Sequence, residues 1–301
     1  MSATVQGLPF RIGARTLASI PRRLRRVALS LDQSIEGAAP ELPALVPGEH
    51  GYILTSLPDD ALAGLTARGM IAQVRQRYAR YWTDLGIGHD AWLAGLSGNA
   101  RSALKRKRKK LEQHTDGMSI LRYRSPAELA EFHALARPLA ELTYQERLMG
   151  EGLPDDAGFL RDMYRLAGED RVRAWLLLLG ERPVAYLWCS ADGATLRYDY
   201  VGHDPAFAEL SPGTVLHAAA FADLFAEGRF RRFDFTEGEG QHKRQFATAG
   251  VACADLLLLR ATWPNRAALA ALRAWDGAVA ATKRVATHPA LGVAVKRLRR
   301  A

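Results

Sequence analysis

Residues 195–246 read TLRYDYVGHDPAFAELSPGTVLHAAAFADLFAEGRFRRFDFTEGEGQHKRQF, and this stretch decides the fold class of the chain. Apolar and polar residues alternate over 195–201, as in a strand with one buried face. Ser211-Pro212-Gly213 then begins an alanine-rich run with helical spacing, which ends at Gly228. Phe230, Phe233 and Phe235 then indicate the next strand. The stretch therefore predicts a strand, a helix and a second strand.

The start of the predicted helix is suited to bind an anion. Ser211 is a favourable N-cap residue, and Pro212 fits the first helical turn, where an amide hydrogen would have no helical partner. The first amides of a helix can therefore hold a phosphate group. Gly213 has no side chain to obstruct the approach of phosphate oxygens. We expect a phosphate-bearing ligand at this position.

The composition is that of an ordinary globular protein. The chain has 301 residues, of which 48% are hydrophobic and 24% charged, enough for one large domain or two smaller ones. A formal net charge of +9 favours an anionic partner such as a nucleotide cofactor, RNA or an acidic membrane. No apolar run approaches the ~20 residues that span a bilayer, and the start of the chain lacks a signal-peptide pattern. We therefore expect a cytoplasmic protein.

The cysteines and histidines indicate neither a disulfide nor a metal site. Cys189 and Cys253 fall in apolar, strand-like runs, which is typical of buried, reduced core residues. No cluster of His and Cys has metal-ligand spacing, so we expect no metal.

From Met118 onward the pattern gives a clear order of elements, β-α-α-β-β-β-α-β-α-β. Ser125-Pro126 begins the first helix, with Glu128 as a capping-box partner. Before the deciding stretch, strands are expected over 118–123, 172–179 and 184–190, and a helix over 157–167. After it, a short helix over 241–248 and a strand over 254–260 follow.

Four further segments are less specific, and three of them carry much of the basic charge. Residues 22–29 form a short amphipathic run, read as a solvated helix face or as a contact with a membrane surface. Residues 70–85 fit a strand or a helix. Residues 97–111 predict a basic helix, which either rims an anionic substrate channel or binds nucleic acid. Residues 263–301 read as two basic helices, with Pro264 and Pro289 as breaks.

The element order, the Ser-Pro-Gly loop and the FDF-x-x-G…HKRQF run together resemble the GNAT acyltransferase superfamily. They are most similar to its FemAB-like and CelD-like branch, which carries an SPG…G…FDF…G…YK..F pattern. The resemblance covers roughly residues 90–260, including the basic helix over 97–111. It implies an α/β (α+β) fold, with a mixed sheet flanked by helices and splayed between its fourth and fifth strands. The expected organisation is an N-terminal region over 1–90, interpreted as a degenerate GNAT-like half, a catalytic domain over 91–262 and a basic helical tail over 263–301.

The resemblance also implies where an acyl donor would bind. Amides at the start of the central helix would hold the pyrophosphate of coenzyme A, and strand-edge amides would polarise the reacting carbonyl. By position these are Ser211, Gly213, Thr214 and Val215 for the pyrophosphate, and Tyr200 and Val201 for the carbonyl. The superfamily loop usually begins with Arg or Gln and has two glycines, whereas Ala208 and Ser211 stand at those places here. FemAB relatives with similar loops use aminoacyl-tRNA, so that donor is the alternative.

Acyl transfer requires a base for the acceptor and a group that stabilises the developing oxyanion. The candidate bases are Asp199, Asp234, Glu237 and His242. Strand alternation would set Asp199 on the face opposite Tyr198 and Tyr200. For Asp234 the alternative is a turn cap or a pair with a neighbouring arginine. Lys243 matches the lysine that neutralises phosphate or the oxyanion in FemAB relatives, and His242 stands where these have Tyr. We expect His203 and His217 to be structural.

The acceptor side is less specific. Tyr144 and Arg147 fall where the superfamily shapes its acceptor mouth. The leading hypothesis is an acyltransferase that moves an acyl group, expected to be acetyl, from acyl-CoA to an amine or hydroxyl of a small-molecule or cell-envelope precursor. The alternatives are an aminoacyl-tRNA-dependent transferase and a non-catalytic basic module that binds membrane or nucleic acid.

Overall fold

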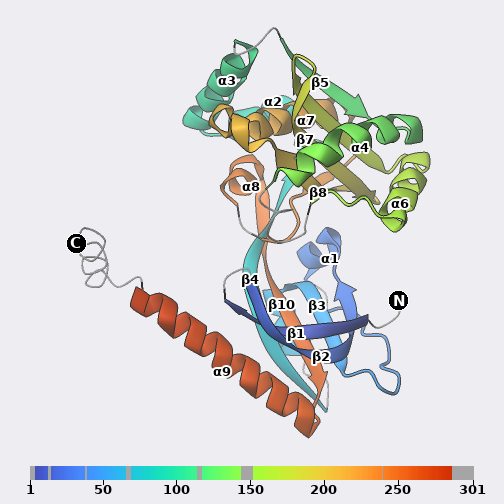
Figure 1. Cartoon of the computed structure of the whole chain (residues 1–301), viewed down its shortest axis with the longest axis vertical. Helices are drawn as coiled ribbons and strands as arrows, with labels where there is room; N and C mark the ends of the chain where they lie inside the picture. The colour runs from blue at the N-terminus through green and yellow to red at the C-terminus, as the bar shows by residue number, and fades with distance from the viewer. Residues whose placement is uncertain are drawn as a thin grey trace. The chain divides into compact units, whose positions relative to one another are not determined.

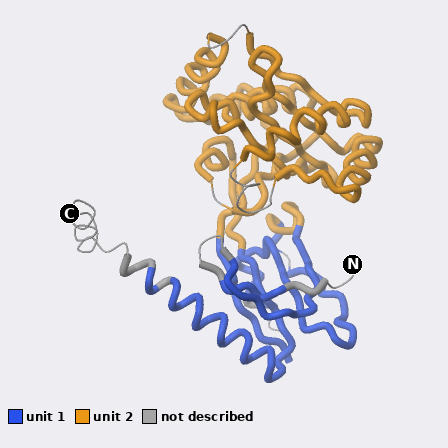
Figure 2. The backbone as a smooth tube through the Cα atoms, viewed as in Figure 1, with its two compact units in different colours: residues 1–29, 36–77, 254–301 blue, residues 30–35, 78–253 orange. Residues whose placement is uncertain are grey.

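The computed structural model describes residues 4–12, 15–37, 39–65, 69–113, 117–143, 152–238 and 240–286. The chain forms two compact units, one of residues 1–29, 36–77 and 254–301 and the other of residues 30–35 and 78–253 (Figure 2). We expected consecutive segments instead. The units interleave in sequence because β4 (Met70–Asp84) and β10 (Ala249–Arg260) each have residues in both.

The unit of residues 30–35 and 78–253 is built on a mixed sheet with strand order β5-β6-β7-β8-β9-β4. The strands other than β4 are β5 (Met118–Tyr123), β6 (Val172–Leu179), β7 (Arg182–Asp192), β8 (Thr195–His203) and β9 (Arg232–Asp234). Strands β5 to β8 pair antiparallel, β8 and β9 pair parallel, and β9 pairs antiparallel with β4. The parallel pair needs a crossover connection, which α7 (Pro212–Glu227) supplies.

Helices cover both faces of this sheet and enclose two cores (Figure 1). One core contains α7, α2 (His89–Gly95) and α3 (Gly98–Glu112), and the other contains α4 (Pro126–Glu141) and α6 (Ala157–Gly168). The remaining short elements are α1 (Leu31–Glu36), η2 (Leu85–Ile87), η3 (Pro205–Leu210) and α8 (Gln241–Phe246). This arrangement confirms the predicted mixed α/β fold and its element order.

Local sequence signals account for several of these elements. Ser125 Oγ accepts a hydrogen bond from Glu128 N, and the Glu128 carboxylate accepts one from Ser125 N, so the predicted capping box is present. Cys189 and Cys253 are both buried, as expected. Gly228 ends α7 in the left-handed conformation that glycine adopts without strain.

A β-bulge in β8 corrects the expected direction of its side chains. Trp188 of β7 pairs with Tyr200 and Cys189 pairs with Tyr198, so Asp199 is an extra residue in β8. As a result Tyr198 joins the core on the α7 face, whereas Tyr200 packs against the other core. The expectation that both tyrosines share one face is therefore wrong. The bulge also returns Val201 to the α7 face.

The other unit has a sheet with strand order β1-β2-β3-β10-β4. Its further elements are β1 (Thr4–Ile12), β2 (Arg15–Ala28), β3 (Gly51–Pro58), η1 (Asp59–Leu65) and α9 (Trp263–Ala286). Along β10, Leu256 packs in the core that contains η1, whereas Leu257 packs in the core that contains α9.

The structure bears on three expectations for this unit, and one of them is wrong. Residues 22–28 lie in strand β2, not in a helix. Leu24 packs in the core that contains α9 and Val27 packs against the core that contains η1, so apolar residues of the run face both sides of the sheet. Residues 70–84 are a strand. Residues 263–286 form a helix with Pro264 in its first turn, as expected for the first of the two helices; Pro289 and the second expected helix lie outside the described residues. Within the described part of the chain, none of the helices combines the length and apolar character needed to cross a membrane.

Candidate active site

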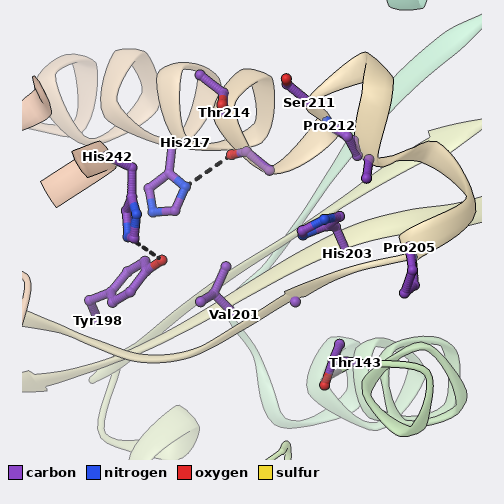
Figure 3. Close-up of a pocket in the computed structure, with 13 residues that line it drawn as sticks. Thr143, Tyr198, Val201, His203, Pro205, Ser211, Pro212, Thr214, His217 and His242 are labelled. Carbon is purple, nitrogen blue, oxygen red and sulfur yellow. Dashed lines mark hydrogen bonds between the residues drawn. The ribbon is translucent and has the colours of Figure 1, made fainter. Parts of the chain in front are cut away.

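A pocket of about 550 Å³ lies where β8, the start of α7 and α8 meet (Figure 3). It is formed within the unit of residues 30–35 and 78–253. Its walls are backbone and side chains of Thr143, Tyr198, Val201, Gly202, His203, Pro205, Ala208, Ser211, Pro212, Gly213, Thr214, His217 and His242. The volume is in the range of small-molecule and cofactor sites.

The pocket opens where β8 and β9 separate. The two strands pair over Thr195–Arg197 and Arg232–Asp234, and Val201 lies beyond that pairing on the same strand. Amides of β8 past Arg197 therefore face a gap in the sheet, where a ligand carbonyl can accept their hydrogen bonds. The separation of the fourth and fifth strands of this sheet is the one that the GNAT resemblance predicts.

The backbone at the start of α7 forms one wall of the pocket. Ser211 adopts a left-handed conformation, with φ 55°, and its side chain makes no capping hydrogen bond. Its carbonyl oxygen instead accepts from Thr214 N at 3.0 Å and from Val215 N at 3.4 Å. A Cβ on Gly213 would point into open space, with His203 Nδ1 as its nearest neighbour at 4.0 Å. The helix start is thus unobstructed beside Gly213, as the sequence predicts.

Not all the predicted donor residues line this pocket. Ser211, Gly213, Thr214 and Val201 do. Val215 is buried in the core, and Tyr200 points to the opposite face of the sheet because of the bulge at Asp199.

Helix α3 adds positive charge at the same place. Lys107 Nζ donates a hydrogen bond to Thr214 Oγ1 at 3.3 Å, and Lys110 Nζ donates to the Glu209 carbonyl at 3.3 Å. Two cations therefore lie beside the positive end of the α7 dipole, which strengthens the field for an anion. The basic pattern of residues 97–111 predicted the helix but not which two of its lysines lie beside the start of α7.

Three aromatic side chains form the inner end of the pocket (Figure 3). Tyr198 Oη and His242 Nε2 share a hydrogen bond of 3.2 Å, and the His217 ring lies 4.9 Å from the Tyr198 ring. Burial raises the pKa of Tyr198 far above its ordinary value, so the phenol stays protonated. Burial, and then the charge of Lys243, lower the pKa of His242, which is therefore neutral at neutral pH.

His217 has a defined tautomer. Its Nδ1 lies 2.9 Å from the carbonyl oxygen of Gly213, so Nδ1 carries the hydrogen and donates it. Burial lowers its pKa to about 4, and Nε2 is buried and has no hydrogen-bond partner among the residues that the structure describes. Four residues separate His217 from Gly213, and helical side chains lean toward the N-terminus. That spacing is the sequence signal from which the place of His217 in this site could have been predicted.

Asp234 lies outside the pocket, in a buried ion pair. Its carboxylate is fully buried and accepts hydrogen bonds from Arg80 Nε at 3.1 Å, Arg80 Nη2 at 2.5 Å and Thr236 N at 2.8 Å. A general base needs a lone pair within reach of the acceptor. This geometry favours a structural role for Asp234, with Arg80 as partner and not the neighbouring arginines that we considered.

The other charged candidates also lie outside the pocket lining. Asp199 accepts hydrogen bonds from Ser190 N at 2.9 Å and Ser190 Oγ at 2.5 Å, and burial raises its pKa. Lys243 is buried and donates to the carbonyl oxygen of Glu237 at 2.6 Å, which ties down the turn after β9. Of the five predicted catalytic residues, His242 lines the pocket. Tyr144 and Arg147, predicted for the acceptor, lie outside the described residues.

Comparison with known proteins supports the same class. Residues 98–244 match the family model described as acetyltransferase (GNAT) domain. The crystal structure of FemX is similar at 12% identity and a TM-score of 0.52, over 85% of this chain and 88% of that one. The C-terminal domain (DUF2156) of a putative lysylphosphatidylglycerol synthetase from Agrobacterium fabrum is similar at 11% identity and a TM-score of 0.51, over 75% and 72% of the two chains. No curated protein matches the chain.

The match confirms that this chain contains a domain of the GNAT acyltransferase superfamily. The two structural relatives share its fold, which agrees with the resemblance to the FemAB-like branch. Acyl transfer is the general chemistry of this class.

Proposed function

We propose that this protein is an acyl-CoA-dependent acyltransferase of the cytoplasm. It would transfer an acyl group, most simply acetyl, to an amine or hydroxyl of a small-molecule or cell-envelope precursor. The observation that carries the proposal is the pocket at the β8–β9 separation, which joins an open strand edge to the unobstructed start of α7.

The residues fit the two ends of an acyl-CoA. The space above Gly213, the helix dipole and the Lys107 ammonium suit the pyrophosphate. The open edge of β8 near Val201 suits the thioester, whose carbonyl oxygen becomes negative during the reaction.

Tyr198 and His242 supply the proton transfers. The acceptor nitrogen or oxygen bonds to the thioester carbon, the carbon–sulfur bond breaks, and the proton that the acceptor loses ends on the sulfur. A neutral His242 can take a proton, and the Tyr198 hydroxyl, which lines the same pocket, can give one to the departing thiolate. Their hydrogen bond connects the two.

The second candidate is an aminoacyl-tRNA-dependent transferase. The placement of Lys107 and Lys110 at the start of α7 favours it, since a basic helix beside the donor pocket can also bind an RNA backbone. Acidic membrane is a further partner proposed from the net charge.

Titration calorimetry with acetyl-CoA, a longer acyl-CoA and bulk tRNA separates these candidates. The proposal expects acetyl-CoA to bind and to acylate an amine or hydroxyl acceptor, with release of the free thiol. Binding of bulk tRNA alone would favour the second candidate, and binding of none of the three would overturn both.

A further inference from the structure

A second cavity, of about 450 Å³, lies on the α7 face of the sheet between α2, α3, β5 and α7. It does not share residues with the pocket at the β8–β9 separation. Its lining is His89, Trp92, Leu93, Gly98, Arg101, Ser102, Leu104, Lys105, Arg108, Met118, Ile120, Val215, Ala218, Ala219 and Ala222. We call it the α3–α7 groove.

Small side chains on α7 leave the space that forms the groove. Val215, Ala218, Ala219 and Ala222 follow one another at intervals of three, one and three residues, so they lie along one stripe of the helix. The three alanines are half-buried, although large apolar residues fill the sheet-facing stripe of the same helix. Packing of α3 against α7 therefore leaves an apolar channel partly open.

The other walls are hydrocarbon as well. Met118 and Ile120 alternate along β5 toward this face, and Leu104 adds the α3 side. Trp92 forms part of the wall with its polar atom already satisfied, since Nε1 donates to the Phe246 carbonyl at 2.9 Å. Its ring stacks on Phe221 at 5.0 Å, which fixes its orientation.

The rim of the groove is cationic. Lys105 and Arg108 are exposed on α3, one turn apart. The Arg108 guanidinium pairs with Glu112, but both side chains of that pair are exposed, so it is weak and can exchange. Arg101 instead donates to the Ala94 and Leu96 carbonyls, which secures α2. Lys105 and Arg108 are thus the cations suited to an incoming anion.

We propose that the α3–α7 groove binds a fatty-acid-like anion, a single hydrocarbon chain with a terminal carboxylate. The apolar walls would take the chain, and Lys105 and Arg108 would hold the carboxylate. A nucleobase would need several fixed hydrogen-bonding groups, whereas Ser102 and His89 are the polar side chains that this lining offers besides its basic residues and the already bonded Trp92. The proposal goes beyond acyl transfer and does not depend on it.

The direct test is calorimetry of the full-length protein with octanoate, decanoate and dodecanoate, each below its micelle concentration. Affinity should rise with chain length, by up to about fourfold for each methylene that becomes buried. Dodecyltrimethylammonium should bind at least about tenfold more weakly than dodecanoate, because its head group is positively charged and is repelled by the cationic rim. Saturating acetyl-CoA should leave dodecanoate binding unchanged, which separates this site from the donor pocket.

Paired variants locate the site. Ala219→Trp fills the groove and should weaken dodecanoate binding by about tenfold or more, whereas Ala226→Trp, on the exposed end of the same helix, should not. Lys105→Glu with Arg108→Glu should weaken it by about tenfold, and Arg106→Glu with Lys109→Glu, an equal change of charge outside the lining, should have little effect.

Far-UV circular dichroism checks folding, and Ala222→Leu replaces Ala219→Trp if that variant does not fold. Absence of dodecanoate binding to the wild-type protein would overturn the proposal. Equal weakening by Ala219→Trp and Ala226→Trp would overturn it too. Binding to anionic vesicles without binding to dodecanoate would contradict it by assigning the rim to a membrane surface.

Discussion

The ion pair between Arg80 and Asp234 allows a direct test of whether the Asp234 carboxylate is structural or catalytic. The Asp234 side chain is 0% exposed and that of Arg80 is 5% exposed. Asp234→Asn would leave the Arg80 guanidinium buried without its counter-charge. Removing one partner of a buried pair typically costs about 3–5 kcal/mol. For a unit of this size that corresponds to a fall in melting temperature of about 6–20 °C.

The assay measures thermal unfolding and turnover on the same preparation. We expect Asp234→Asn to lower the melting temperature strongly while kcat per folded molecule stays within about threefold of wild type, since the carboxylate lies outside the pocket. Glu112→Gln is the control, because it removes the same charge from an exposed pair and should cost no more than ~1 kcal/mol.

The opposite result would refute this reasoning. If Asp234→Asn unfolds like wild type but loses about 10²-fold or more in kcat, the carboxylate acts as a base. The pocket would then have to extend to β9, and the assignment of proton transfer to Tyr198 and His242 would be wrong.

Three further predictions concern the donor pocket. Lys107→Gln with Lys110→Gln should weaken acetyl-CoA binding several-fold in calorimetry; a large loss of tRNA binding, a shallower salt dependence and unchanged acetyl-CoA binding would instead favour the RNA donor. The pKa of His217 is about 4 in the folded protein, lower than the 6.5 of an unfolded histidine. Between these pH values the unfolded chain binds more protons than the folded protein does. The free energy of unfolding should therefore fall by up to about 3 kcal/mol as the pH drops from 6.5 to 4. His217→Phe should remove that part of the pH dependence of the melting temperature, and an unchanged profile would contradict the burial argument. Tyr198→Phe should lower kcat by roughly 10²-fold with donor affinity nearly unchanged, because the variant loses only the hydroxyl group that gives the proton. Equal kcat in both proteins would exclude Tyr198 as the proton donor.

Local signals were enough to predict much of the fold. The Ser125 capping box, the Ser-Pro-Gly helix start and the alternating strands around them each act over a few residues, and the structure confirms these elements. The prediction of a helix over 22–29 was wrong because such a short amphipathic stretch fits both the helical and the strand period. The pairing of β2 with β1 and β3 decides in favour of a strand.

The arrangement of the site could be predicted only in part. The unobstructed backbone at Gly213 follows from the residue itself. In contrast, the bulge at Asp199 depends on strand register, and Arg80 is 154 residues from Asp234 in sequence. Strand alternation alone therefore assigned Tyr200 to the wrong face of the sheet. No pattern in the residues around Asp234 indicated that its carboxylate forms an ion pair with an arginine so distant in sequence.

The most direct test of the donor site is the affinity of the Gly213→Asp variant for acetyl-CoA. Gly213 does not have a positive φ and a Cβ there meets only open space, so the variant should fold, and a carboxylate in the first turn of a helix is favourable. The new carboxylate would occupy the space proposed for the pyrophosphate and would repel its negative charge. Calorimetry should show a loss of affinity of about tenfold or more, or about 1.4 kcal/mol. Gly98→Asp, in the first turn of α3, is the matched control and should bind as wild type does. Unchanged affinity in a folded Gly213→Asp protein would contradict an acyl-CoA site at the start of α7.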